Sequence, residues 1–222
     1  MSSRDKILGA LKTKEREVTH PPAWRTRRNF DDLAERFEMA LTKAKGEVLR
    51  ADSLAEATDR LSEVLEELNA QKVIANNVEP LNQLDLENRW SNIDWRIVEQ
   101  SDGNLRDFCE AADVGISSAD AALAETGSIV ITSGPGRSRL ATLLPTVHVA
   151  MVPTSLLTTD VFTWTAMRDG AAPTPNGTMP ANLVLVSGPS KTADIEQTLA
   201  YGIHGPQQLI VLLLNASEKI SD

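Results

Sequence analysis

Hydrophobic positions in the first half of the chain follow helical and strand spacings in alternation. Over residues 54–70 the apolar side chains recur every three or four positions and acids fall on the opposite side, which predicts an amphipathic helix. The same reasoning predicts further helices at 31–44, 81–90 and 104–112, and strands at GEVLRA, KVIAN and WRIVEQ. Helices that alternate with short apolar strands are typical of a mainly parallel sheet covered on both faces. The predicted fold class is therefore α/β, with a Rossmann-like pattern that lacks a dinucleotide fingerprint.

After Asp113 the charges become sparser and glycines stand at the ends of strand-like runs. The expected strands in this half are SIVITS, VHVAMVP, NLVLVSG and LIVLLLN, which we interpret as one continuous sheet. Backbone can turn sharply or lie close to a ligand at glycine, because glycine has no Cβ. We therefore expect any chemistry in this half.

The N-terminal segment differs from the rest of the chain. Ile7, Leu8 and Leu11 have helical spacing after Ser3, which predicts a short amphipathic helix, and prolines and arginines follow it. Two interpretations stay open for Trp24 and the basic run from Arg25 to Arg28: docking on the domain, or contact with an anionic partner. We expect residues 1–28 to form a helix and linker, and residues 29–222 to form a single α/β domain.

Composition excludes several classes of protein. The net charge of −9 argues against a nucleic-acid partner, because binding phosphates needs clustered Lys and Arg. No apolar run approaches the roughly 20 residues of a membrane span, and the start of the chain has no signal-like stretch, so a cytoplasmic protein is expected. The single cysteine, Cys109, is expected to be a core thiol, and the dispersed histidines His20, His148 and His204 predict no metal site. We expect no intrinsic cofactor.

The first candidate site is the segment ADAALAETGSIVIT. Glu125, Thr126 and Gly127 stand there directly before an apolar strand. A carboxylate at a strand edge can act as a base or a nucleophile where neighbouring donors support it. A Glu that caps a turn, with Gly127 present for backbone geometry, explains the same residues.

The second candidate is a glycine-rich loop followed by Arg137, Arg139 and, in the next strand, His148. Amides at Gly134 and Gly136 can form an anion-binding nest, and an arginine can bind a carboxylate or phosphate through two hydrogen bonds. His148 lies between two valines in a strand, so it faces either a cleft or solvent.

The third candidate is LVLVSGPSKTADIEQTLAYGIHGP, interpreted as a strand, a glycine turn and a helix that begins near Thr192 or Ala193. The first amides of a helix lack internal partners and favour anions, so a phosphate-containing ligand would fit there, although the segment is not a Walker A loop. A tight turn before the last strand holds an imidazole between two glycines. The candidate residues of the third segment are Ser187, Gly188, Ser190, Lys191, Thr192, Asp194, Glu196, Gly202, His204 and Gly205, with His204 and Glu125 as the catalytic candidates.

Three segments in the second half resemble the lactate utilization protein C family, whose members consist of a LUD domain: ADAALAETGSIV, RLATLLPTVHVAMVP and VLVSGPSKTADIEQTLAYGIHGPQQLIVLLL. The resemblance implies a Rossmann-like three-layer sandwich similar to the sugar-phosphate isomerase and coenzyme A transferase superfamily. It also implies a place in a multi-protein system that oxidises L-lactate to pyruvate, with partners that carry the iron-sulfur clusters. This chain has a single cysteine, which agrees with iron-sulfur clusters being carried by the partner proteins.

The sequence is compatible with three functional hypotheses. The first is an accessory or substrate-handling subunit of lactate oxidation with a cleft for a small carboxylate or another anionic ligand. The second is a free-standing transferase-like or ligase-like enzyme that uses Glu125, and the third is a non-catalytic assembly or regulatory protein. We also expect Glu125, Arg139, His204 and Asp194 to approach one cleft, because all four stand beside glycine turns at strand ends.

Overall fold

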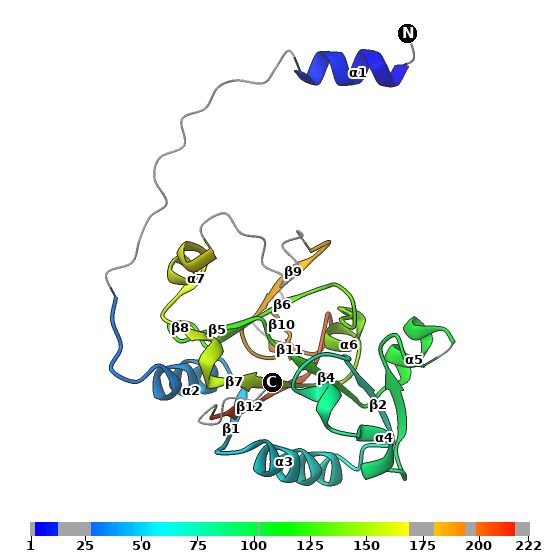
Figure 1. Ribbon diagram of the computed structural model, residues 1–222, viewed down its shortest axis with the longest axis vertical. Coiled ribbons are helices and arrows are strands. Elements are labelled where there is room, and N and C mark those ends of the chain that lie inside the picture. Colours follow the sequence, from blue (N-terminus) through cyan, green and yellow to red (C-terminus); the bar gives the residue numbers. More distant parts are fainter. Residues whose placement is uncertain (1–2, 13–27, 102, 169–179, 194–198, 216–222) are drawn as a thin grey trace.

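The computed structural model describes residues 3–12, 28–101, 103–168, 180–193 and 199–215 (Figure 1). Of the residues singled out in the sequence, His20, Trp24, Arg25, Asp194 and Glu196 lie outside these ranges.

A parallel sheet of six strands forms the centre of the molecule. Its strand order is β1-β12-β7-β4-β2-β3, and each neighbouring pair is parallel. The strands are β1 (Glu47–Ala51), β12 (Gln208–Leu214), β7 (Val147–Pro153), β4 (Val114–Ser118), β2 (Lys72–Ala75) and β3 (Asp94–Ile97). In β4 and β12 nearly every residue is buried, as expected for strands covered on both faces.

One face of this sheet is covered by helices that follow the predicted apolar spacing. Leu61 and Leu65 of α3 (Leu54–Glu67) pack against Val149 and Leu212 in the largest core cluster. The 3-10 helix η1 (Leu81–Gln83) and α4 (Leu86–Arg89) complete this layer, so the helix predicted over 81–90 is divided into two short pieces. Ser53 begins α3 by accepting a hydrogen bond from the Glu56 amide at 3.1 Å.

The opposite face of the main sheet is covered by further helices and by a second sheet, which together give three layers (Figure 1). Helix α2 (Leu33–Lys43) contributes Phe37 and Leu41, both fully buried. Helices α5 (Leu105–Ala111) and α6 (Leu140–Leu143) cover the neighbouring region. The predicted α/β three-layer architecture is confirmed.

The prediction of one continuous sheet is wrong. A separate sheet has the order β8-β5-β6-β9, with antiparallel pairs on both sides of β6. Its strands are β8 (Leu157–Thr158), β5 (Ala121–Leu123), β6 (Ser128–Thr132) and β9 (Leu183–Val186). The 3-10 helix η2 (Thr154–Leu156) directly precedes β8. Ile129 packs toward the main sheet, while Val130 packs against Trp164 of α7 (Val161–Arg168). Because β6 is buried on both faces, its hydrophobicity resembles that of a central parallel strand.

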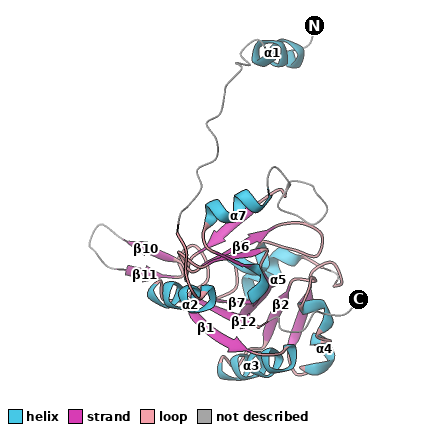
Figure 2. Cartoon of the chain, turned by 60° about the vertical axis from the view of Figure 1, so that its left-hand side comes forward, coloured by secondary structure: helices cyan, strands magenta, loops and turns pink. Residues whose placement is uncertain are grey.

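The helix expected to begin near Thr192 is also absent. Lys191–Ala193 instead forms β10, which pairs antiparallel with β11 (Leu199–Tyr201). Figure 2 shows this hairpin projecting from the body beside α2. An anion site at a helix N-terminus therefore does not exist at residues 191–193.

Helix α1 (Ser3–Lys12) forms where the sequence predicted it, and its residues 3–10 are exposed. None of the helices in the described part of the chain has the length and apolar character that crossing a bilayer requires.

Candidate functional site

The turn that holds Glu125 joins β5 to β6 and packs tightly on helix α2. Gly127 has φ of +65°, and its amide donates to the Leu123 carbonyl at 2.9 Å. A Cβ on Gly127 would lie 2.3 Å from the Leu41 nitrogen and 2.6 Å from the Leu41 Cα. The glycine is therefore required both for the backbone conformation and for the approach to the α2 backbone.

Glu125 is held by both its main chain and its side chain. Its amide donates to the Thr159 carbonyl at 2.9 Å, and its carbonyl accepts a hydrogen bond from the Arg36 guanidinium at 3.0 Å. The Glu125 carboxylate, with 24% of the side chain exposed, forms an ion pair with Arg28. Arg36 lies over the Phe30 ring with its guanidinium carbon 5.1 Å from the centroid. Two arginines from the segment before and within α2 thus surround this carboxylate turn.

A chain of three hydroxyl groups connects this turn to the end of β9. Thr126 Oγ1 lies 2.6 Å from Ser128 Oγ, which in turn lies 2.6 Å from Ser187 Oγ. Thr126 and Ser187 are exposed at the two ends, whereas Ser128 is 3% exposed. Connected hydroxyls of this kind can hold the oxygens of a ligand or pass a proton along the chain.

The segment after Ser187 returns to the C-terminal end of α2. Gly188 has φ of +100°, and a Cβ there would lie 2.6 Å from the Ala44 carbonyl oxygen. The exposed Lys191 ammonium donates to the same carbonyl. The structure thus brings together Glu125, Thr126, Gly127, Ser187, Gly188 and Lys191, which come from two separate motifs of the sequence; we call this group the α2-end cluster.

The remaining candidates of the third segment form a compact loop. The Ser190 amide donates to the Pro206 carbonyl at 2.8 Å, and the Gly202 amide donates to the Ser190 carbonyl at 3.0 Å. A Cβ on Gly205 would lie 3.4 Å from the Ser190 Cβ, and His204 is exposed. Thr192 pairs with Ala200 in the hairpin.

In the glycine-rich loop after β6, the groups expected to bind an anion already have partners within the protein. Arg137 forms an ion pair with Asp120 and donates to Thr132 Oγ1 at 3.1 Å. The Gly136 amide donates to the Glu99 carboxylate at 2.8 Å. The anion in this nest is thus a side chain of the protein. Arg139, at the start of α6, is exposed.

His148 faces neither solvent nor an open cleft. It is 1% exposed in β7, and its Nε2 lies 2.8 Å from Ser117 Oγ in the adjacent strand β4. Burial lowers the pKa of His148 from 6.5 to about 4, so the ring is neutral near pH 7. Nδ1 has no hydrogen-bond partner among the described residues. The geometry is that of a core histidine.

Glu125, Arg139 and His204 share no hydrogen bond or ion pair within the described chain, and Asp194 lies outside it, so their common cleft stays a prediction. The described residues contain no group of three or more His, Cys, Asp or Glu side chains suited to a metal ion.

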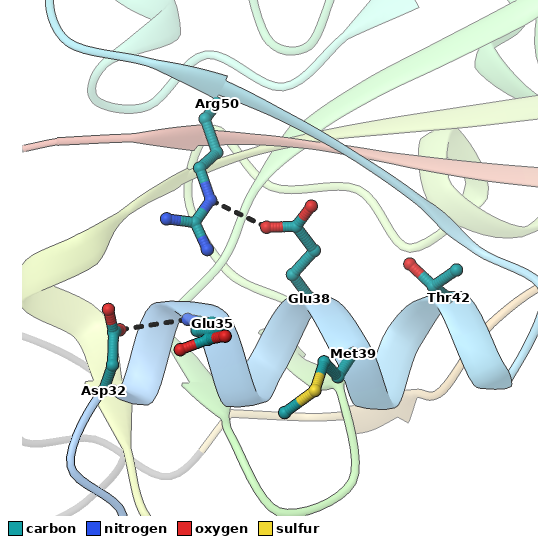
Figure 3. A pocket seen from close by; sticks show the side chains of 6 residues that line it. All are labelled: Asp32, Glu35, Glu38, Met39, Thr42 and Arg50. Carbon is teal, nitrogen blue, oxygen red and sulfur yellow. Dashed lines mark hydrogen bonds and ion pairs between the residues drawn. The ribbon is translucent and has the colours of Figure 1, made fainter.

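Two hollows on the described surface were not predicted. One, of about 690 Å³, runs along α2 and is lined by Asp32, Glu35, Glu38, Met39, Thr42 and Arg50. Figure 3 shows Arg50 directed at Glu38, with an Nε-to-carboxylate distance of 2.7 Å. The other, of about 340 Å³, lies at the carboxyl ends of β2 and β3 and includes Asn76 and Asn77. The sequence carried a signal for the second hollow, because an asparagine pair directly follows the buried run KVIA.

Comparison with known proteins identifies relatives over most of the chain. The model of the LUD domain family matches residues 34–214. A protein named lactate utilization protein C from Exiguobacterium is 33% identical over 218 residues, which cover 92% of this chain and 88% of that protein. A protein of the same name from Halalkalibacterium halodurans is 36% identical over 71% of this chain and 67% of its own length.

A solved structure has a similar fold. The crystal structure of a DUF162 family protein from Deinococcus radiodurans superposes with a TM-score of 0.56 at 19% identity, covering 82% of this chain and 96% of that one. At this identity the likeness concerns the arrangement of helices and strands.

Proposed function

This chain belongs to the LUD domain family, and we propose that it takes part in lactate utilization as an accessory or substrate-handling subunit. The observation that carries the proposal is the similarity, along 92% of the chain, to a protein named lactate utilization protein C. Shared sequence over nearly the whole length argues for a shared role more strongly than a shared fold does, since one fold supports many functions.

We propose the α2-end cluster as the place where a small carboxylate such as lactate is held. Lys191 supplies an exposed positive charge, and the exposed hydroxyls of Thr126 and Ser187 supply hydrogen bonds to ligand oxygens. Arg28 already neutralises the Glu125 carboxylate, which reduces its repulsion of an incoming anion.

Oxidation of L-lactate to pyruvate releases two electrons and two protons, and this chain needs partners to accept the electrons. A cluster held by four cysteine thiolates would have to belong to another chain, because this chain has one cysteine. We therefore propose iron-sulfur proteins as the electron-carrying partners.

Growth on L-lactate tests the proposal. The host gene is deleted, L-lactate is supplied as the sole carbon source, and the wild-type gene, Glu125→Gln or Glu110→Gln is returned. Glu110 is a matched control, because it is an exposed carboxylate paired to Arg106 on helix α5, away from the α2-end cluster. Growth should fail without the gene and return with wild type and Glu110→Gln.

Growth with Glu125→Gln distinguishes a chemical role of Glu125 from a binding or assembly role of the protein, provided that immunoblots show equal amounts of each variant. Failure to rescue assigns Glu125 a chemical or charge-dependent role in lactate use. Full rescue removes Glu125 from the reaction and leaves a binding or assembly role. Normal growth on L-lactate without the gene would refute the proposed function.

A further inference from the structure

The smaller hollow lies where ligands of open α/β sheets commonly bind. The chain runs from β2 outward to β3 at the edge of the sheet and then back past β2 to β4, so the direction of travel reverses between β2 and β4. Such a reversal opens a crevice outside the carboxyl ends of the strands. The hollow of about 340 Å³ lies beside this crevice, on the β3 side of β2, and is lined by residues that follow β2 and β3, including Asn76, Asn77 and Gln100. We propose that it binds one small uncharged molecule through vicinal hydroxyl groups, as found in a monosaccharide or in the ribose of a nucleoside.

Asn76 provides the main observation for a ligand. The residue is only 2% exposed, and its Oδ1 accepts a hydrogen bond from the Ser138 amide at 2.9 Å. That bond fixes the carboxamide so that Nδ2 is the remaining donor, and Nδ2 donates to no other group in the described chain. A carboxamide nitrogen with no protein acceptor can donate to an oxygen of a bound molecule. Because Asn76 lines the hollow, an oxygen of a bound molecule is placed to accept that hydrogen bond.

The chemistry of the lining selects an uncharged, hydroxyl-bearing ligand. Its other carboxamides, Asn77, Asn82, Gln83 and Gln100, each offer a donor and an acceptor, which matches the hydroxyl group. Its charged residues are two acids and no base, so a carboxylate or phosphate would be repelled.

Part of the lining of the hollow is apolar. Leu81, Leu84, Leu86 and Ile97 are 1% to 6% exposed and can contact the non-polar face of a sugar ring or a base. A volume of about 340 Å³ is near the lower end for small-ligand sites, so it suits one such molecule and not a dinucleotide.

The rim of the hollow is held rigid before any ligand arrives. The Asn77 amide donates to the Gly136 carbonyl at 2.7 Å, and the Gly136 amide donates to the Glu99 carboxylate at 2.8 Å. Glu99 adopts φ of +65°, and a Cβ on Gly136 would lie 2.5 Å from the Asn77 carbonyl oxygen. The glycine-rich loop thus serves this hollow by ordering its edge, which reduces the entropy lost on binding.

Titration of the full-length protein followed by NMR tests the inference. The probes are D-ribose, D-glucose, adenosine and L-lactate, and the signals are the side-chain amide resonances of Asn and Gln. Asn82→Ala removes one lining carboxamide, and Asn92→Ala is the matched control, an exposed asparagine outside the lining. Asn76→Asp keeps the acceptor for the Ser138 amide and removes the donor. Each lining variant should weaken binding about tenfold, and Asn92→Ala should not change it.

Saturable shifts with adenosine alone identify a nucleoside ligand, and saturable shifts with a free sugar identify a monosaccharide ligand. Saturation by none of the three hydroxylated probes would overturn the proposal. Equal weakening by Asn82→Ala and Asn92→Ala would do the same, as would tighter binding of L-lactate than of the uncharged probes at this hollow. If Asn76→Asp fails to fold, the comparison of Asn82→Ala with Asn92→Ala still decides. This site is independent of the α2-end cluster, so either proposal can fail alone.

Discussion

Replacing Gly127 with alanine should strongly destabilise the protein, because two separate penalties act at this position. Gly127 has φ of +65°, and the left-handed conformation costs an L-residue roughly 1–2 kcal/mol. The new Cβ would also lie 2.3 Å from the Leu41 nitrogen and 2.8 Å from the Ala40 carbonyl carbon, both of them backbone atoms. Backbone atoms cannot rotate away, so α2 must shift, and overpacking of this kind typically costs about 1–3 kcal/mol. We therefore expect a loss of roughly 2–5 kcal/mol in the free energy of unfolding.

The loss can be measured by thermal and urea denaturation. For a chain of this size, each kcal/mol lowers Tm by roughly 2–4 °C, so a decrease of about 10 °C is expected. Gly134→Ala is the control, because nothing lies within 4 Å of the Cβ that it would add and its φ is not positive. That substitution should change stability by roughly 0.5 kcal/mol or less.

The two variants together test the packing of the Glu125 turn against α2. Equal Tm values for Gly127→Ala and Gly134→Ala would refute it, since of these two positions Gly127 alone has the crowding and the positive φ. If Gly127→Ala is destabilised but still folded, it should also lose rescue on L-lactate, because the same turn positions Glu125 in the α2-end cluster.

Three further predictions follow from buried groups. Burial lowers the pKa of His148 from 6.5 to about 4, so between pH 6.5 and pH 4 the unfolded state takes up a proton and the folded state does not. The free energy of unfolding should therefore fall by about 2 kcal/mol from pH 7.5 to pH 5, and urea titrations should show a smaller fall for His148→Gln. Asp120→Asn should lower the free energy of unfolding by about 3 kcal/mol, because it leaves the half-buried Arg137 without its charged partner. The double variant Asp120→Asn with Arg137→Met should regain part of this loss, and no gain in its free energy of unfolding would contradict the interpretation. Burial raises the pKa of Cys109 from 9.0 to about 11. Iodoacetamide at pH 8 should therefore alkylate Cys109 about 100-fold more slowly in the folded protein than in urea, and mass spectrometry measures both rates.

The sequence predicted the central sheet and its helices well, because their signals are local and periodic. Helix α3 has its apolar residues on one face and a serine cap, and both features can be read without knowing what it packs against. The second sheet could not be separated from the first in this way. Strand β6 is buried on both faces like β7, and its partners β5 and β9 are fixed by contacts distant in the chain.

The helix predicted after Ser190 failed for a related reason. The residues after the SGPSK turn have the composition of a helix start, with acids at positions 194 and 196. The hydrogen bonds of Ser190 to Pro206 and Gly202, together with strand pairing to residues 199–201, commit Lys191–Ala193 to an extended conformation. Tertiary pairing thus overrides a local preference that is worth only tenths of a kcal/mol per residue.

Motifs showed where unusual backbone occurs, but the function of each glycine depends on its neighbours in space. Gly127 and Gly188 both allow the chain to touch α2, at Leu41 and at Ala44, and so assemble one cluster from two distant motifs. Gly136 belongs to a loop with similar composition, yet its amide binds Glu99 and its close approach is to Asn77. The glycine-rich half therefore supports two separate places, the α2-end cluster for an anion and the amide-lined hollow for an uncharged ligand. Because acids alone carry charge in that hollow, and Lys191 is exposed in the cluster, the two places are expected to differ in ligand charge.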